Sequence, residues 1–205
     1  MQRDKILISA GALLIIVLLI SGIEPYDRAT WVMEVAPVLI ALPLMAATYQ
    51  RFPLTTLLYS LIFFHALVLI AGGAYTYARV PLGFWMQDVL AMDRNPYDKI
   101  GHFMQGFVPF FVAREFLWRG GYLVRRGMLA FLSVCFVMMV SSFYELIEWW
   151  AALALGQGAE EFLGTQGYEW DTQSDMFYAL IGAITAMLAL TRIHDRQMDR
   201  LMQRE

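Results

Sequence analysis

The chain has 205 residues, of which 59% are hydrophobic and 16% are charged, and its formal net charge is −3. So large an apolar fraction exceeds what a soluble domain of this size can bury, and it predicts a membrane protein. The slightly acidic balance argues against nucleic acid as a partner, because DNA and RNA are bound by basic faces. The single cysteine, Cys135, allows no disulfide within the chain.

Six apolar stretches each approach the ~20 residues that a helix needs to cross a bilayer. We therefore expect an all-α fold: a polytopic bundle of about six transmembrane helices, in a single membrane domain over residues 1–205. The first stretch is longer than the apolar part of a signal peptide, and we interpret it as a retained helix. The expected helices cover approximately residues 5–23, 31–49, 53–72, 96–118, 128–155 and 172–192.

Lys and Arg are unevenly distributed between the two sides of this bundle, and such a bias sets orientation. If the N-terminus is inside, most basic residues are inside, and the outer segments hold only Arg28, Arg79, Arg94 and Lys99. We therefore predict that both termini are cytoplasmic. The basic tail after Thr191 is expected to extend the sixth helix at the cytoplasmic leaflet.

The outer segment 74–95 contains a short aromatic and apolar run, 81–86, which cannot span a membrane. Its composition suits a segment that lies at the membrane interface, or a flap over the outer end of the bundle.

Three of the expected helices carry pairs of ionisable residues at the end that this topology places outside. An ionisable residue within a membrane segment is a functional-site hypothesis by default, because charge in hydrocarbon is costly. The agreement in depth between pairs from distant parts of the chain indicates that they meet. The pairs are Asp98 and His102, Glu145 and Glu148, and Asp171 and Asp175.

The spacing of these residues places each pair in a polar stripe on one face of its helix. Because lipid offers polar groups no partner, the stripes should face each other and form a pocket that opens toward the outer side. The stripes are Asp98, His102 and Gln105; then Ser141, Glu145 and Glu148; then Asp171, Ser174, Asp175 and Tyr178.

So many carboxylates in one pocket cannot all be ionised without compensation. A divalent metal such as Mg, Mn, Fe or Zn would neutralise them with oxygen ligands and one imidazole. Protonated acids poised for proton transfer, or pairing with Arg94 or Lys99, are the alternatives. The predicted metal ligands are Asp98, His102, Glu145 and Asp175.

Some of these residues also have a simpler interpretation. Asp98 follows Asn95 and Pro96 in a typical helix start, and Asp171 could cap the sixth helix in the same way. This capping interpretation does not suit Glu145 and Glu148, because the C-terminal part of a helix disfavours anions. 

Two further residues are candidates for the pocket. Glu34 could either join it or reach the membrane interface, and His65 could support pocket residues from a deeper position.

The three polar motifs resemble those of VanZ-like membrane proteins over residues 95–190. Residues 97–103 are similar to their D-K-x-x-H element, 145–150 to their second acidic element, and 171–183 to their D-x-x-x-D-x-x-x-N-x-x-G element, with Ala179 in place of the asparagine. Over essentially its whole length the chain resembles the YjdF-type bacterial inner-membrane family. This resemblance implies a helical bundle in the bacterial inner membrane. Its VanZ-like part implies envelope or lipid-linked substrates, since such proteins are linked to lowered susceptibility to teicoplanin-type antibiotics.

The leading functional hypothesis is a membrane enzyme that acts on an amphiphile near the outer leaflet. Metal- or carboxylate-assisted hydrolysis or group transfer would use Glu148 or Asp171 as the base. The expected partners are the bilayer and a lipid-linked small molecule. The alternatives are cation- or proton-linked binding or transport, and a structural polar cluster that fixes helix packing.

Overall fold

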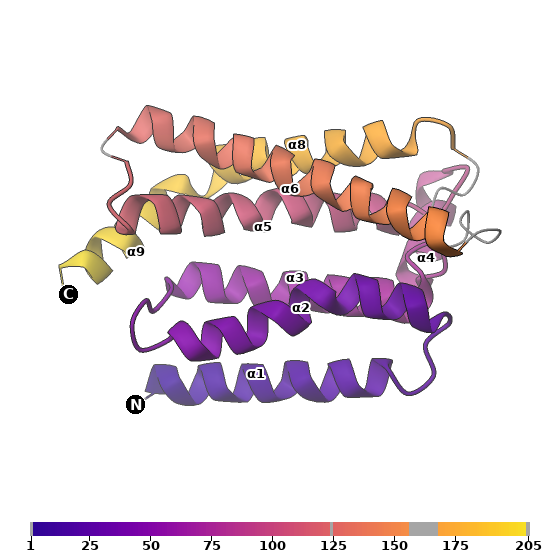
Figure 1. Cartoon of the computed structure of the whole chain (residues 1–205), viewed down its shortest axis with the longest axis horizontal. Helices are drawn as coiled ribbons and strands as arrows, with labels where there is room; N and C mark the ends of the chain where they lie inside the picture. Colours follow the sequence, from indigo (N-terminus) through magenta and orange to yellow (C-terminus); the bar gives the residue numbers. More distant parts are fainter. Residues whose placement is uncertain (1, 124, 156–167, 204–205) are drawn as a thin grey trace.

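The computed structural model describes residues 2–123, 125–155 and 168–203, and over these residues the fold is all-α. Figure 1 shows the first three helices in one part of the bundle and α5, α6 and α8 in the other. The start of α1 and the end of α9 share one end of the bundle, which we call the terminal end (Figure 1). The helices are α1 (Gln2–Ser21), α2 (Arg28–Thr48), α3 (Thr56–Tyr75), α4 (Pro81–Leu90), α5 (Tyr97–Arg119), α6 (Arg126–Leu155), α8 (Asp171–Ala189) and α9 (Thr191–Met202).

The prediction of an all-α polytopic membrane protein is confirmed. Within the described residues, four helices are long and apolar enough to cross a membrane: α1, α2, α3 and α6. The pair α8–α9 passes the same test as one unit, but a bend of 66° separates its two parts. The number of six spans and the cytoplasmic location of the termini stay predictions.

Local capping explains where two of the apolar helices begin. Asp27 precedes α2, and its carboxylate accepts a hydrogen bond from the Thr30 backbone N–H at 2.8 Å. This bond lowers the pKa of Asp27, because it favours the charged form. Thr55 caps α3, and its hydroxyl accepts a bond from the Leu58 N–H at 3.2 Å.

The helices α5 and α8 pack closely along much of their length, because glycine lies on each side of the contact. A Cβ atom on Gly106 would collide with the carbonyl oxygen of Ala179, and one on Gly182 would collide with that of Phe103. Small residues permit such an approach between membrane helices. The adjoining apolar core is fully buried and includes Leu58, Val108, Phe110, Phe111, Val137, Ala179, Ala183 and Ala186.

The segment between α3 and α5 contains only one helix of 10 residues, α4, which is too short to span a membrane. The side chain of Asn95 joins this segment to α5. Its amide donates to the Val80 carbonyl at 3.1 Å, and its oxygen accepts from the Tyr97 N–H at 3.0 Å. Asn95 therefore satisfies the first N–H group of α5, and Asp98 is not required for that role. The interfacial position of this segment stays a prediction.

The sequence predicts that the basic tail extends the last membrane helix. In the structure the tail is helical, but α9 bends away from α8, and its polar groups bond to other helices. After the bend, Nε2 of His194 lies 2.9 Å from Oε2 of Glu115 on α5. The Gln197 side chain accepts a hydrogen bond from the Leu57 N–H at the start of α3, at 2.9 Å. These contacts hold α9 against α3 and α5.

A buried cluster at the terminal end joins three parts of the chain, and the sequence analysis did not anticipate it. We call Thr55, Glu115, Arg119 and His194 the Glu115 cluster. Glu115 accepts from the Thr55 N–H at 2.9 Å, from the Thr55 hydroxyl at 2.8 Å and from Arg119 at 2.8 Å. Its side chain is completely buried, so these bonds satisfy a charge that water cannot reach.

Candidate functional site

Two helices bring together three of the four predicted metal ligands. Nε2 of His102 on α5 lies 3.4 Å from Oδ1 of Asp98, one turn earlier, and 3.7 Å from Oδ2 of Asp175 on α8. One ligand atom from each of the three residues lies within 4.8 Å of the others. The close packing of α5 on α8 at Gly106 holds the two helices at this separation.

A hydrogen bond at the far side of the imidazole sets the orientation of His102. Its Nδ1 lies 3.0 Å from Oε1 of Gln105, which is one turn further along α5. When Nδ1 carries the proton, it donates to this oxygen, and Nε2 keeps its lone pair toward Asp98 and Asp175. Histidines that bind metals are held in this way by a partner on the second ring nitrogen.

The fourth predicted ligand, Glu145, is buried near this group. It comes from α6 and lies within electrostatic range of His102 and Asp98, but it is not among the three residues whose ligand atoms lie within 4.8 Å of one another. Its side chain is 9% exposed, and its Oε1 atom has no hydrogen-bond partner among the described residues. Oδ1 of Asp175 and the hydroxyl of Ser141, one turn before Glu145, are also buried without a hydrogen-bond partner among the described residues.

Asp171 occupies a different environment from the other acids of the site. Its Oδ1 accepts a hydrogen bond from the Arg94 guanidinium at 2.7 Å, in an ion pair at the start of α8. The same guanidinium stacks on the Tyr168 ring, 4.4 Å from its centre. Asp171 therefore has a cationic partner, whereas Asp175 faces an imidazole and another acid.

A cavity of about 110 Å³ adjoins the cluster between the two parts of the bundle. Glu148 lines it, together with Glu34 and His65, so both residues that the sequence left undecided face the same space. The other lining residues are Pro37, Leu69, Tyr77, Asp98, Gly101, His102, Gln105, Pro109, Val140 and Tyr144.

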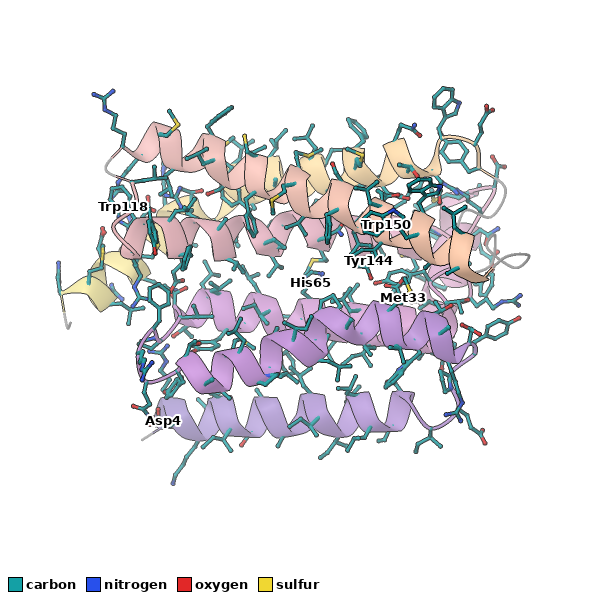
Figure 2. All side chains as sticks on the ribbon, in the orientation of Figure 1. Asp4, Met33, His65, Trp118, Tyr144 and Trp150 are labelled. Carbon is teal, nitrogen blue, oxygen red and sulfur yellow. The ribbon has the colours of Figure 1, made fainter. Side chains whose placement is uncertain are left out.

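Tyr144 joins α6 to α2 at the side of this cavity. Its hydroxyl lies 3.1 Å from Oε2 of Glu34 and 3.4 Å from the Met33 carbonyl oxygen. Figure 2 shows Tyr144 and Met33 near each other between the two helices, and His65 in the space between α3 and α5. Nε2 of His65 is buried and has no hydrogen-bond partner among the described residues.

Tyr77 is a lining residue that the sequence analysis missed. It follows α3 in the left-handed region, with φ of 40°, after Thr76 with φ of 54°. Its ring fills the space beside Gly72 and Gly101, where a Cβ atom on either glycine would collide with it. Burial raises the pKa of its hydroxyl, which also hydrogen-bonds to Glu34. No helical spacing marks a residue in a connecting segment, so the sequence held no signal for it.

Fold and site together define a class: a multi-pass helical membrane protein with a buried acid–histidine cluster at the end of the bundle opposite the termini. The chain belongs to the family described as "Predicted membrane protein (DUF2238)", which matches residues 6–196.

The chain is similar to "Inner membrane protein YjdF" of Escherichia coli (strain K12). The two are 57% identical over 198 residues, which cover 97% of this chain and 95% of that protein. No solved structure matches the chain. The resemblance to the YjdF-type family and the location in the bacterial inner membrane are confirmed. The VanZ-like resemblance and the roles of the site residues stay predictions.

Proposed function

We propose that the chain is a divalent-metal-dependent enzyme that hydrolyses an amphiphile, or transfers a group from it, inside the inner membrane. Asp98, His102, Glu145 and Asp175 would hold the metal, and Glu148 would act as the base. The proposal depends on geometry at the site, since the name of the family describes no activity.

The distances within the cluster suit a metal with nitrogen and oxygen ligands. When ligand atoms lie about 2.1 Å from such a metal, neighbouring ligand atoms are roughly 3.0–3.4 Å apart. From Nε2 of His102, the distance of 3.4 Å to Asp98 lies at the upper end of this range, and the distance of 3.7 Å to Asp175 lies slightly above it. Oxygen ligands with a single imidazole favour Mg, Mn, Fe or Zn over ions that prefer thiolates.

The observation that carries the proposal is the pair of buried carboxylate oxygens without a partner. Oδ1 of Asp175 and Oε1 of Glu145 are buried, and neither is hydrogen-bonded to any described residue. In the Glu115 cluster, by comparison, both oxygens of the buried carboxylate accept hydrogen bonds, although Nδ1 of His194 has no partner among the described residues. Oxygens that remain unsatisfied next to a histidine with a defined orientation are typical of a site that binds a ligand.

The cavity gives the reacting group a place beside the cluster. Its volume of about 110 Å³ is smaller than the ~300 Å³ typical of whole-ligand pockets, so it suits a reacting group and a water molecule. A metal would polarise the acyl or phosphoryl oxygen of the substrate. The water oxygen would bond to the acyl carbon or to phosphorus. Glu148 would accept the water proton and pass it to the leaving group as that bond breaks.

The surroundings of the cavity favour an amphiphile as the substrate. Pro37, Leu69 and Val140 contribute apolar lining next to the acids. The cavity lies within the bundle beside α2 and α6, both of which are candidate membrane spans. A substrate with an apolar chain reaches such a site from the bilayer, while its polar group contacts the acids.

Structure at the other end of the bundle disfavours transport through the protein. The fully buried side chains of Phe110, Phe111 and Val137 belong to an apolar core. On α5 the two phenylalanines come between the cavity residue Pro109 and the Glu115 cluster. A continuous polar pathway for a cation or proton would have to cross this core. An enzyme that works from one side of the membrane needs no such path.

The first test is the metal content of protein purified in detergent without chelators. We expect close to one divalent metal per chain in the wild type, and at least a tenfold loss in Asp175→Asn. Glu34→Gln is the matched control, because Glu34 is a buried acid beside the same cavity that is hydrogen-bonded to two tyrosines. A wild type without metal would contradict the proposal, and so would an Asp175→Asn variant that retains its metal.

The second test separates metal binding from catalysis. Wild-type protein is incubated with a bacterial lipid extract, and the products are compared by mass spectrometry with those of Glu148→Gln and Asp175→Asn. We expect a product that only the wild type forms, while Glu148→Gln retains its metal. A product that Glu148→Gln forms at the wild-type rate would remove this residue from the mechanism.

A further inference from the structure

A second cavity lies at the terminal end of the bundle, whereas the acid–histidine cluster lies at the opposite end. Its volume is about 250 Å³, and polar and basic residues form most of its lining. The residues come from the start of α1, the start of α3 and the last turns of α9: Arg3, Thr55, Thr56, Gln197, Arg200 and Leu201.

Two arginines from opposite ends of the chain give this cavity its charge. Arg3 is held in place, because its guanidinium donates to the Leu54 carbonyl oxygen just before α3 and lies over the Tyr59 ring. Its Nε atom is buried, and it has no hydrogen-bond partner among the described residues. Arg200 extends from α9 on the other side. Arginine is the residue best suited to phosphate, since its planar fork donates two parallel hydrogen bonds.

Among the residues that the structure describes, the acids near these arginines already have partners elsewhere. Asp4 accepts a hydrogen bond from the Tyr49 hydroxyl and lies at the terminal end (Figure 2). Asp195 accepts from both Arg114 and Arg126, the latter at 2.7 Å. Asp199 lies 3.7 Å from Arg126. 

The buried acid of the Glu115 cluster is also compensated. Its carboxylate is bonded to Arg119 and His194, so it does not neutralise the arginines of the cavity.

The start of α3 adds a further positive element. This helix has 20 residues, and its N-terminal turn faces the cavity through Thr55 and Thr56. The first N–H groups of a helix and its dipole favour an anion at this position. Three donors near this turn are taken within the chain: the Leu57 N–H by Gln197, the Leu58 N–H by the Thr55 hydroxyl, and the Thr55 N–H by Glu115. Gln197 also brings α9 to the edge of the cavity, where Arg3 and Arg200 carry the positive charge.

We propose that this cavity is a binding site for a phosphate group, held between Arg3, Arg200 and the start of α3. The phosphate could belong to the headgroup of an anionic phospholipid or to a free phosphate ion. The predicted orientation places the cavity at the cytoplasmic leaflet, where anionic lipids meet basic residues. This site is independent of the metal-dependent activity proposed above.

The test uses full-length protein in a neutral detergent and measures its thermal midpoint and its ligand adducts by native mass spectrometry. The probes are short-chain phosphatidylglycerol, short-chain phosphatidylcholine and inorganic phosphate. We expect phosphatidylglycerol to bind and stabilise the wild type more than phosphatidylcholine does. Removal of one guanidinium in Arg200→Gln should weaken this binding about fivefold.

Two control variants make the test specific. Arg192→Gln removes an exposed positive charge from the same helix but not from the cavity lining, and it should bind within about twofold of the wild type. Asp175→Asn, which alters only the acid–histidine cluster, should bind phosphatidylglycerol normally. 

The outcomes separate the two sources of the phosphate. Binding of phosphatidylglycerol without binding of inorganic phosphate identifies a lipid headgroup, and binding of inorganic phosphate identifies a site for the free ion. Equal binding of both lipids would overturn the proposal, and so would an equal loss of binding in Arg200→Gln and Arg192→Gln.

Discussion

The contact between α5 and α8 makes the strongest quantitative prediction, because it positions the acid–histidine cluster. Gly106→Ala adds one methyl group that would collide with the Ala179 carbonyl oxygen. The colliding atom belongs to the backbone of α8, so no change of rotamer relieves the contact. The two helices must separate, and His102 on α5 must then move away from Asp175 on α8.

The size of the effect follows from two opposing terms. Overpacking a close-packed interface costs about 1–3 kcal/mol, and a collision with backbone belongs at the upper end of this range. Alanine favours the helix over glycine by about 1 kcal/mol. We therefore expect Gly106→Ala to lower the free energy of unfolding by about 2 kcal/mol, and to weaken metal binding at His102 and Asp175.

Denaturant titration in detergent micelles measures this loss, and metal analysis of the same samples measures the effect on the cluster. Gly11→Ala is the matched control, since a Cβ atom there has no neighbour within 4 Å. It should leave metal binding unchanged and raise stability by up to about 1 kcal/mol. If Gly106→Ala proved as stable as Gly11→Ala, with full metal content, the reasoning about this contact would be refuted.

Three further predictions concern other parts of the fold. Glu115→Gln removes a buried anion beside Arg119 and should lower the unfolding free energy by about 3 kcal/mol in the same titration; an unchanged value would show that the cluster contributes little. Tyr144→Phe removes the hydroxyl contact with Glu34 and should lower it by about 1 kcal/mol without loss of metal. Asp27→Ala should cost about 1 kcal/mol through loss of the helix cap. Because the folded pKa of Asp27 is lowered, this contribution is present above its usual carboxyl pKa and disappears as the pH falls through the lowered value. A pH titration in which the wild type and Asp27→Ala keep a constant difference down to acidic pH would contradict this.

The sequence predicted which helices meet at the site because two features agreed there: the spacing of polar residues along one helix, and the lengths of the apolar runs. The i, i+4 spacing of Asp98 and His102 defined a face of α5, and the apolar run lengths placed Asp175 of α8 at the same depth. Depth and face together are enough to predict proximity between helices that cross a membrane. They do not predict distances, which depend on the glycines that permit close contact between α5 and α8.

The Glu115 cluster shows why the rest could not be predicted. Glu115 is the only acid in the last three turns of α5, and it has no polar stripe that would distinguish it from a residue at the membrane surface. Its partner His194 is 79 positions away and reaches it only after the bend between α8 and α9. A bend that depends on tertiary contacts leaves no periodic signal in the sequence.

The polar residues of α5 explain why this central helix is not among the candidate spans chosen by apolar composition. It carries the acid–histidine cluster at one end and Glu115 at the other, and it packs against α3, α6, α8 and α9. A helix with such neighbours need not be apolar all round, because other helices cover the faces that lipid would otherwise contact. His102 and Glu115 each bond to side chains from the chain itself. Low hydropathy in α5 is therefore compatible with the predicted span over residues 96–118, because the neighbouring helices supply the apolar surface.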